Sequence, residues 1–326
     1  MKLSIVLPVF NVEAYLKRCV ESCLNQDLPK KDYEIIIVND GSTDNSPKIA
    51  KQLCDEYNNI KIVNRVNGGL SAARNTGMQV ASGDYIWFID SDDYIEKDVL
   101  SRIIDNIERN SLDCLWIQWN QVSENGHILP PYSPHLKSNN DSVMDGYSFM
   151  EKVLSTYLFS WSFIFKASFV KQYAFTEGMY YEDTDFAFRF LPKIARIKLL
   201  DEKIYNYVQR KTSITSHISE KKMLDILTNA QNGKRLHDEN LNNSNRANFF
   251  FDSYSDFMLF AVKECGKTGN RKLSNLVENF VRESSITKIK VYGNTPSKFI
   301  AIAYNLLGVR WSLFVSRILF KLYFLL

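Results

Sequence analysis

Three carboxylates follow a short apolar segment in YIWFIDSDDYI, which spans residues 85–95. Asp90, Asp92 and Asp93 would repel one another unless a positive group lay among them. One aspartate could cap the following helix, but a cap does not account for three. An EF-hand loop is excluded because its sixth position lacks glycine. Clustered carboxylates at a strand end suit a hard divalent cation that leaves coordination positions for phosphate oxygens. The stretch therefore predicts a cation site.

The elements that must position these carboxylates alternate between strands and helices. Apolar runs predict strands at 3–9, 34–38, 60–63, 85–89 and 114–119, with helical spacing between them. This alternation predicts an α/β fold with an open, largely parallel sheet covered on both faces. Ligands of such sheets bind beyond the carboxyl ends of the strands. Four loops should converge there, those after Pro8, Val38, Val63 and Ile89.

Two further loops carry groups that could bind a ligand. In NDGSTDNS (39–46), Asp40 and Asp44 could accept from sugar hydroxyls or base N–H groups, or form only a turn and a helix cap. In NRVNGGLSAARNTG (64–77), the helix after Gly68-Gly69 could direct free N–H groups at an anion. Arg74 could equally be a structural ion-pair partner. The residues alone leave both alternatives open.

The second half of the chain is less regular. Residues 127–144 predict a long connection, KIYNYV (203–208) a strand, and the chain beyond Lys211 only helices, near 219–238, 246–264 and 270–285. In YYEDTDF, Glu182, Asp183 and Asp185 precede a helical pattern and could simply cap that helix.

Four ordered segments resemble successive signatures of glycosyltransferase family 2. They are IVLPVFNVEAYLKRCVESCLNQ, EIIIVNDGSTDNS, NGGLSAARNTGMQVASGDYIWFIDSDD and YYEDTDFAFRF, within roughly residues 1–215. The resemblance implies a GT-A fold, a Rossmann-like, mostly parallel mixed sheet flanked by helices. Residues 1–120 would bind a nucleotide sugar and 121–215 the acceptor. A helical extension would follow over 216–295.

The resemblance also implies roles for matching residues. Asp92 would bind Mn²⁺ or Mg²⁺, and Trp161 would shape the acceptor pocket unless it is only core packing. Asp44 would support its loop, and Tyr207 and Ser213 would belong to a late loop that closes over the diphosphate. The residues assigned to the nucleotide sugar are Pro8, Phe10, Asn11 and Glu13 at the base, Asp40 on the base, Gly69, Ser71 and Arg74 near the diphosphate, Asp90 near the ribose, Ser91 beside it, Asp93 for the sugar or the loop, and Arg210 on the diphosphate.

An inverting transfer needs a base. The acceptor hydroxyl must lose its proton as it attacks the anomeric carbon opposite the leaving nucleotide, and a positioned carboxylate can take that proton. The family's Glu-Asp pair falls on Glu182 and Asp183; Asp183 is the predicted base and Glu182 the reserve. The predicted reaction moves a hexose or N-acetylhexosamine from a UDP-sugar to a hydroxyl of a glycan or lipid-linked saccharide. The alternative is a non-catalytic nucleotide-sugar-binding or scaffold subunit of a membrane polysaccharide assembly, which the intact Asp-x-Asp and Glu-Asp motifs disfavour.

The composition sets the remaining expectations. The 326 residues carry 40 Lys or Arg and 37 Asp or Glu, a net charge of +3 that is too balanced to imply a nucleic-acid partner. Five scattered cysteines indicate a reducing, cytoplasmic setting. The start MKLSIVLPVF lacks the length and cleavage site of a signal peptide and predicts a buried strand.

The last segment, 296–326, predicts an amphipathic helix. Arg310, Arg317 and Lys321 interrupt its apolar run, which argues against a transmembrane span. A narrow basic stripe with many aromatic residues suits a helix lying in the headgroups of an anionic leaflet. We therefore expect a peripheral protein on the inner face of the cell membrane. The alternative is a helix packed on the protein's own core or on a second copy in a homodimer.

Overall fold

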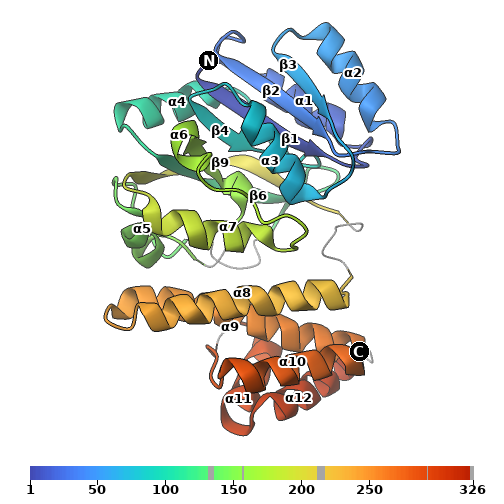
Figure 1. Ribbon diagram of the computed structural model, residues 1–326, viewed down its shortest axis with the longest axis vertical. Helices are drawn as coiled ribbons and strands as arrows, with labels where there is room; N and C mark the ends of the chain where they lie inside the picture. Colours follow the sequence, from blue (N-terminus) through green and yellow to red (C-terminus); the bar gives the residue numbers. More distant parts are fainter. Residues whose placement is uncertain (131–135, 156–157, 211–216, 292, 324–326) are drawn as a thin grey trace. The chain divides into compact units, whose positions relative to one another are not determined.

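The computed structural model describes residues 1–130, 136–155, 158–210, 217–291 and 293–323. It consists of two compact units. Met1–Gly178 and Glu182–Ser213 form the first, and Met179–Tyr181 and Ile214–Leu326 form the second. We call them the sheet unit and the helical unit (Figure 1).

One mixed sheet organises the sheet unit. Its strands among the described residues are β1 (Leu3–Val9), β2 (Tyr33–Asn39), β3 (Ile60–Asn64), β4 (Tyr85–Phe88), β5 (Tyr94–Ile95), β6 (Cys114–Ser123), β7 (Ile128–Leu129), β8 (Phe163–Lys166) and β9 (Ile197–Gln209). Their order is β3-β2-β1-β4-β8-β6-β9-β5, with β7 paired to β6. The strands β3, β2, β1 and β4 are parallel, whereas β8 is antiparallel to both neighbours. The predicted α/β fold with a mixed sheet is confirmed.

The order of the strands indicates which edge of the sheet could bind a ligand. The chain proceeds from β1 to β2 and β3 on one side, then returns to place β4 on the other side of β1. At such a reversal the loops after the two central strands diverge, which leaves space at their carboxyl ends. Here those loops begin at Phe10 and at Ile89, so the Asp90–Asp93 segment lies at the edge where sheets of this kind bind ligands.

Helices accompany the sheet. They are α1 (Leu16–Leu24), α2 (Ser46–Glu56), α3 (Leu70–Val80), α4 (Leu100–Arg109), α5 (Gly146–Lys152), α6 (Ala167–Val170) and α7 (Glu182–Phe190). Gly77 lets α3 approach the sheet closely, because a Cβ at this position would lie 2.3 Å from Cγ1 of Val6 on β1. Since α3 starts after the carboxyl end of β3, its first turns, with Arg74, lie at the edge that carries the loops.

Two strands extend beyond their prediction. β6 runs to Ser123 and β9 begins at Ile197, and they pair in parallel with irregular register around Gln118. Polar residues such as Asp201 interrupt the apolar pattern of β9, so only its apolar end predicts a strand. Backbone pairing with β6 carries the strand through these positions.

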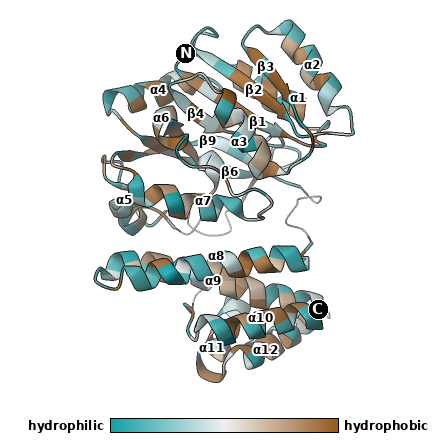
Figure 2. Ribbon diagram, viewed as in Figure 1, coloured by the Kyte–Doolittle hydropathy of each residue, from teal (hydrophilic) through white to brown (hydrophobic). Residues whose placement is uncertain are grey.

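The helical unit contains α8 (Glu220–Glu239), α9 (Ser244–Thr268), α10 (Arg271–Ser284), α11 (Thr295–Leu307) and α12 (Val309–Tyr323). Its core is a cluster of apolar residues contributed by all five helices, including Met258 and Val262 on α9 and Leu313 on α12. Figure 2 colours the ribbon by hydropathy and shows hydrophilic and hydrophobic residues alternating along α8 and hydrophobic stretches on α11 and α12.

The structure has two helices where the sequence predicts one over 296–326. Gly308 ends α11 with φ 84°, a left-handed value that glycine adopts without steric penalty. The chain then turns, and α12 packs on both α11 and α9. The buried face of α12 consists of Ser312, Leu313 and Ser316. This face therefore packs on the protein's own core, as the alternative prediction expected.

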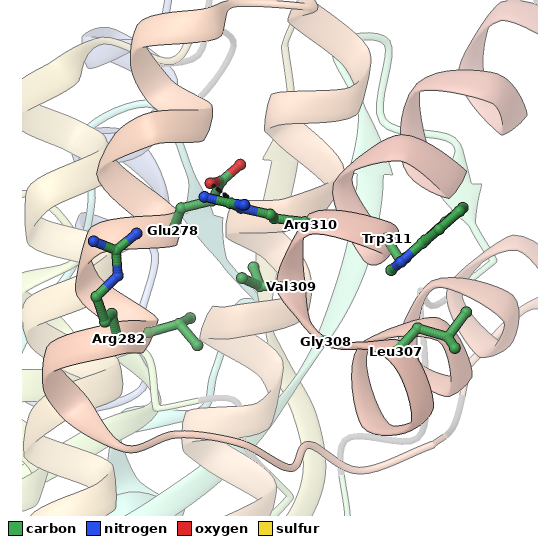
Figure 3. A pocket seen from close by; sticks show the side chains of 8 residues that line it. Glu278, Arg282, Leu307, Gly308, Val309, Arg310 and Trp311 are labelled. Atoms are coloured by element: carbon green, nitrogen blue, oxygen red, sulfur yellow. Dashed lines mark hydrogen bonds and ion pairs between the residues drawn. The ribbon is translucent and has the colours of Figure 1, made fainter.

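A surface pocket of about 520 Å³ lies at the α11–α12 turn (Figure 3). Its lining residues come from α10 and from the turn: Glu278, Val281, Arg282, Leu307, Gly308, Val309, Arg310 and Trp311. Arg310 donates to Glu278 across it at 2.9 Å. None of the motif residues of the sheet unit lines this pocket, so it is separate from the site described next.

Candidate active site

Hydrogen bonds join the loop after β1 to the loop after β2. Oδ1 of Asn11 accepts from the Thr43 amide at 2.8 Å. Oε2 of Glu13 accepts from the Asn45 amide at 2.8 Å, and Oδ2 of Asp44 accepts from the Glu13 amide at 2.9 Å. Burial alone would raise the pKa of Asp44, but hydrogen bonds, chiefly from Ser46, outweigh it and lower that pKa. The polar groups of Asn11 and Glu13 thus hold the loops in shape.

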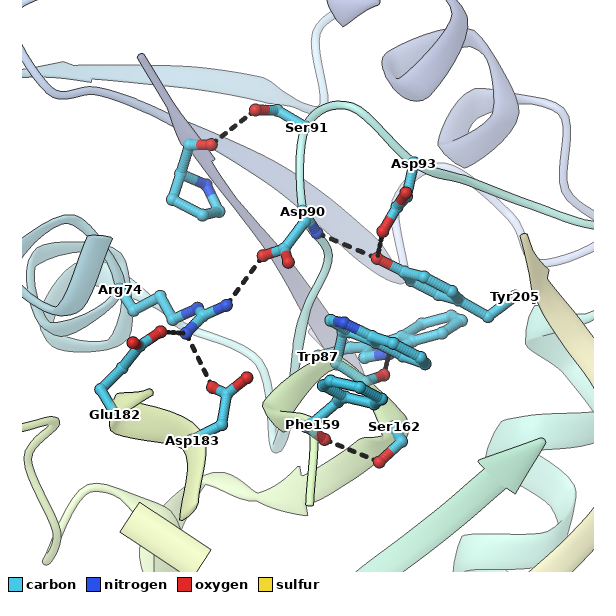
Figure 4. Close-up of polar contacts among 12 residues, drawn as sticks. Arg74, Trp87, Asp90, Ser91, Asp93, Phe159, Ser162, Glu182, Asp183 and Tyr205 are labelled. Carbon is cyan, nitrogen blue, oxygen red and sulfur yellow. Dashed lines mark hydrogen bonds and ion pairs between the residues drawn. The ribbon is translucent and has the colours of Figure 1, made fainter. Parts of the chain in front are cut away.

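An aromatic side chain remains available beside these loops. Phe10 is 47% exposed, whereas Pro8 is buried in β1. The Pro8 carbonyl accepts a hydrogen bond from Ser91 Oγ at 2.7 Å, which ties the end of β1 to the acidic loop (Figure 4). Phe10 is therefore the residue here that could stack on a planar ligand, and Ser91 fixes the backbone.

Asp40 binds the turn before α3. Its two carboxylate oxygens accept from the amides of Gly68 at 3.0 Å and Gly69 at 2.8 Å, and Arg65 Nη1 lies 3.1 Å from Oδ1. The Gly68 and Gly69 amides, which could have bound the anion of a ligand, thus bind the Asp40 carboxylate of the protein itself. Ser71, on the first turn of α3, is buried, and its hydroxyl has no hydrogen-bond partner among the described residues. Sequence reasoning missed Arg65; its signal was a basic residue just before the Gly-Gly pair.

Arg74 lies at the centre of the site. Its Nη2 donates to Asp90 Oδ1 at 2.8 Å, while its Nη1 donates to Glu182 Oε1 at 2.6 Å and to Asp183 Oδ1 at 2.9 Å (Figure 4). Its side chain is 1% exposed and lies 5.2 Å from the ring of Phe175. One buried guanidinium therefore joins the acidic loop after β4 to the start of α7. These contacts are those of a structural ion pair, which is one of the two roles that the sequence left open for Arg74.

Burial and mutual repulsion raise the pKa values of the acids on α7. Burial, followed by the charge of Asp183, raises the pKa of Glu182 to about 7, although Arg74 opposes the shift. Burial also raises the pKa of Asp183, which Arg74 and Ser160 oppose. Carboxyl groups whose pKa values are shifted toward neutrality suit proton transfer. Asp185 stands apart, since it accepts from Thr176 Oγ1 at 2.7 Å and from Arg189 at 2.8 Å.

Asp93 anchors the acidic loop to β9. Tyr205 Oη donates to its Oδ2 at 2.6 Å, and the Val208 amide donates to its Oδ1 at 2.7 Å. Burial, together with the charges of Asp92 and Asp90, raises the pKa of Asp93 well above its usual range. Of the two roles expected for Asp93, these contacts favour the loop. Tyr205 was missed, although its alternation with Tyr207 in one strand was a usable signal.

Asp92 has a cationic partner. Nε of Arg210 lies 2.6 Å from its Oδ2, and the guanidinium lies 5.5 Å from the ring centre of Tyr15. The Asp92 side chain is 19% exposed, and burial raises its pKa against the effect of Arg210. Ser213, expected in the same late loop, lies outside the described residues.

The residues around Asp92 fit a divalent cation that would take some of its ligands from the phosphate oxygens of a bound substrate. Within the described part of the chain, no three His, Cys, Asp or Glu side chains come together as a ready metal site. Asp92 is a partly exposed carboxylate that already attracts a positive side chain. One such carboxylate with phosphate oxygens is a donor set that Mg²⁺ or Mn²⁺ accepts.

Trp161 lies inside an aromatic stack. It is 1% exposed and stacks between Tyr205, at 4.2 Å between ring centres, and Phe159, at 4.8 Å. Its carbonyl accepts from Nε1 of Trp87. Burial at this level favours core packing, the second of the two roles expected for Trp161. Phe159 and Tyr207, both half-buried, are the outer members of the stack.

Comparisons with known proteins find relatives of this chain. The model of the family described as Glycosyl transferase family 2 matches residues 4–173. The uncharacterized glycosyltransferase EpsJ of Bacillus subtilis (strain 168) is 32% identical over 65% of this chain and 62% of its own length. The poly(ribitol-phosphate) beta-glucosyltransferase of Bacillus spizizenii is 44% identical over 35% of this chain and 18% of its own length. The matches thus span less than two thirds of both relatives.

A solved structure shares the fold. The crystal structure of S. aureus TarS 1–349 in complex with UDP-GlcNAc has a TM-score of 0.72 and 20% sequence identity, and the match covers 97% of this chain and 90% of that one. At this identity the likeness concerns the fold. It confirms the predicted GT-A architecture with a C-terminal helical part.

Proposed function

Because this chain belongs to glycosyltransferase family 2, we propose that it transfers a hexose or N-acetylhexosamine from a UDP-sugar to a hydroxyl of a glycan or lipid-linked saccharide. The observation that carries the proposal is the Arg74 cluster, which joins the loop after β4 to the Glu-Asp pair of α7. The fold neighbour with UDP-GlcNAc and the relative named a beta-glucosyltransferase support this class of donor.

The sheet edge would bind the nucleotide. Phe10 stacks on the uracil, and Asp40 accepts from it while continuing to bind the Gly68 and Gly69 amides. Pro8, Asn11 and Glu13 keep the pocket in shape through the loops. Ser71, whose buried hydroxyl has no hydrogen-bond partner among the described residues, could donate to the phosphates. Asp90 lies near the ribose, where Arg74 holds it.

Asp183 is the proposed base. It takes the proton of the acceptor hydroxyl as that oxygen bonds to the anomeric carbon and the bond from this carbon to the UDP oxygen breaks. Direct displacement inverts the configuration, and no covalent intermediate forms. Arg74 keeps Asp183 in place and supports its ionised form before the proton arrives. Glu182 is the reserve base, because it shares the same guanidinium.

Asp92 would hold Mn²⁺ or Mg²⁺ together with the diphosphate. When bound, such an ion neutralises charge on the departing UDP. Arg210 exchanges its pairing with Asp92 for the phosphate oxygens, to which a guanidinium can donate two hydrogen bonds. Both groups then stabilise the leaving group, as developing negative charge requires.

The donor can be identified by a thermal-shift screen. UDP-glucose, UDP-N-acetylglucosamine and other UDP-sugars are added with Mn²⁺, and a ligand that binds the folded state raises the melting temperature. We expect one UDP-sugar to exceed the shift of UDP, and release of UDP from it to accelerate with acceptor. No shift with any UDP-sugar, with or without Mn²⁺, would contradict the proposal.

We also propose that the helical unit binds an anionic membrane surface on the cytoplasmic side. Exposed apolar side chains gather on α11 and α12: Phe299, Ile302, Leu306, Leu307, Trp311, Phe314 and Ile318. We call these residues the apolar ridge; they lie on two helices that pack on each other. Among the described residues, no helix combines the length and apolar composition needed to cross a bilayer.

Charge favours a membrane over another protein as the partner of the ridge. Residues 214–326 carry 16 Lys or Arg against 9 Asp or Glu, a net +7, whereas residues 1–213 carry 24 against 28, a net −4. The predicted basic stripe is partly engaged inside the unit, since Arg310 pairs with Glu278 and Arg317 donates to Ser274 Oγ. The wider positive charge of the unit would draw it to anionic lipid.

Liposome flotation tests this surface. Full-length protein should float with vesicles that contain anionic lipid. The double variant Trp311→Ser with Phe314→Ser should weaken binding about a hundredfold or more, because about 1.5–3 kcal/mol of apolar burial is lost for each large side chain. Thr228→Ala on α8 serves as the control. Absence of flotation, with a dimer in analytical ultracentrifugation, would assign the ridge to a second copy instead.

A further inference from the structure

The three residues before the Glu-Asp pair belong to the helical unit. Met179–Tyr181 clusters with Ile214–Leu326, whereas the chain from Glu182 onward belongs to the sheet unit. The peptide bond between Tyr181 and Glu182 therefore joins the two units at the first residue of α7. Whatever fixes Tyr180 and Tyr181 acts on the start of the helix that carries the acids.

Two buried polar side chains of α8 bind this segment. The Tyr180 amide donates to Oδ2 of Asp225 at 3.0 Å. Nδ2 of Asn229 donates to the Tyr181 carbonyl at 3.1 Å. Asp225 is 6% and Asn229 0% exposed, and Lys221 pairs with Asp225 at 2.5 Å. Hydrogen bonds in such places are costly to leave unmade, so they hold the backbone firmly.

Tyr181 itself has an unusual backbone. Its φ is 59°, a left-handed value that is unfavourable for a bulky residue. Its ring packs at 5.9 Å from Phe260 of α9, so the side chain anchors the same segment. A strained residue of this kind persists only when its surroundings hold it, and such strain is concentrated at functional sites. Release of Tyr181 would change the direction in which the chain enters α7.

We infer that Asp225 and Asn229 of the helical unit are positioning residues for the Glu182–Asp183 pair, an inference that rests on the proposed role of that pair. Through Tyr180 and Tyr181 they fix where α7 begins. Within the sheet unit, the Arg74 contacts hold the same two acids. The helical unit thus contributes to the transfer step itself, in addition to any role at a membrane.

Matched variants of α8 test this role. Asp225→Ala and Asn229→Ala each remove one hydrogen bond to the segment, Asp225→Asn keeps an acceptor oxygen, and Thr228→Ala changes an exposed neighbour that bonds only within its own helix. The readouts are UDP release from UDP-glucose and UDP-N-acetylglucosamine with Mn²⁺, and hydrogen–deuterium exchange of residues 182–190. Full-length protein is used, with melting temperatures as a check on folding.

The alanine variants should lower kcat about tenfold or more while KM for the UDP-sugar stays within about twofold, because misplaced catalytic groups slow the chemical step without weakening donor binding. The amides at the start of α7 should exchange faster. Asp225→Asn should recover most of kcat, and Thr228→Ala should match wild type. If Asn229→Ala folds poorly, the comparison of Asp225→Ala with Asp225→Asn still decides the outcome.

Unchanged kcat and unchanged exchange in Asp225→Ala would overturn the inference. A raised KM with unchanged kcat would overturn it too. Asp183→Asn is assayed alongside, so that the proposed base and the proposed positioning residues are tested separately. If that variant releases UDP as fast as wild type, the base assignment fails, while the exchange of residues 182–190 still reports whether α8 fixes the start of α7.

Discussion

The buried Arg74 cluster of the sheet unit joins distant segments of the chain, whereas two surface ion pairs of α8 in the helical unit lie along one helix. Arg74 donates hydrogen bonds to two acids that lie 108 and 109 positions further along the sequence. Its side chain is only 1% exposed. On α8, Lys234 pairs with Asp238 and Arg235 with Glu239, each four residues apart and at the surface. Exposed pairs contribute little to stability, whereas removal of one partner of a buried pair is costly.

The same contrast holds for apolar residues. In the sheet unit the large aromatic side chains of Trp87, Trp116 and Trp161 are buried, while the helical unit exposes Trp311 and Phe314. The sheet unit thus buries a cluster of charged groups, and the helical unit exposes a ridge of apolar ones. Each departure from ordinary globular structure marks the place where we propose function.

The largest effect is expected from Asp183→Asn. Loss of the base should lower the transfer rate about 10³-fold, since general base catalysis contributes on that scale, while UDP still raises the melting temperature. Asp185→Asn, on the same helix but paired with Arg189, should stay near wild type. The base assignment would be wrong if the effects of the two variants were reversed.

Arg74→Gln tests the buried pairing directly. It leaves the three carboxylates around it without their cation, so the free energy of unfolding should fall by about 3 kcal/mol. Urea denaturation followed by tryptophan fluorescence measures it, because four of the five tryptophans lie in the sheet unit. Arg235→Gln on α8 should cost less than about 0.5 kcal/mol. Equal losses in both variants would remove the contrast between the units.

Asp92→Asn tests the proposed cation site. The extra melting-temperature shift that Mn²⁺ adds to UDP should disappear, and turnover should fall about 10²-fold, because one stabiliser of the leaving group is lost. The control is Asp105→Asn, an exposed aspartate of α4 paired with Arg109. An Asp92→Asn enzyme with full Mn²⁺-dependent turnover would exclude Asp92 as the ligand.

The smallest effect concerns pH. Folding raises the pKa of Glu182 from 4.5 to about 7, so the folded state holds this proton more tightly than the unfolded chain. Its contribution to stability is present below pH 4.5 and is lost as the pH rises through 7. Glu182→Gln should therefore weaken the dependence of the free energy of unfolding on pH over this window. The exposed Glu239→Gln on α8 should leave the slope unchanged; equal flattening by both would contradict the burial argument.

Local patterns were enough to predict the order of strands and helices up to β6, except for the two-residue strand β5. The run Ile35–Val38 and the helical spacing before Leu24 are signals within one element, and the rule for parallel sheets then places the acidic loops at one edge. The family motifs added the roles of Asp92 and Asp183, which remain proposals. Residues such as Tyr205 were missed because their function is a contact with a distant loop.

The tertiary structure alone decided which groups meet. Nothing near Arg74 in the chain reveals that its partners are Asp90, Glu182 and Asp183, or that Asp40 binds the Gly68 and Gly69 amides. Residue types and short-range periodicity express conformational preferences of neighbouring residues. Burial and ion pairing between distant segments depend on how the whole chain packs, so Arg74 could have several roles in the sequence but has one set of contacts in the fold.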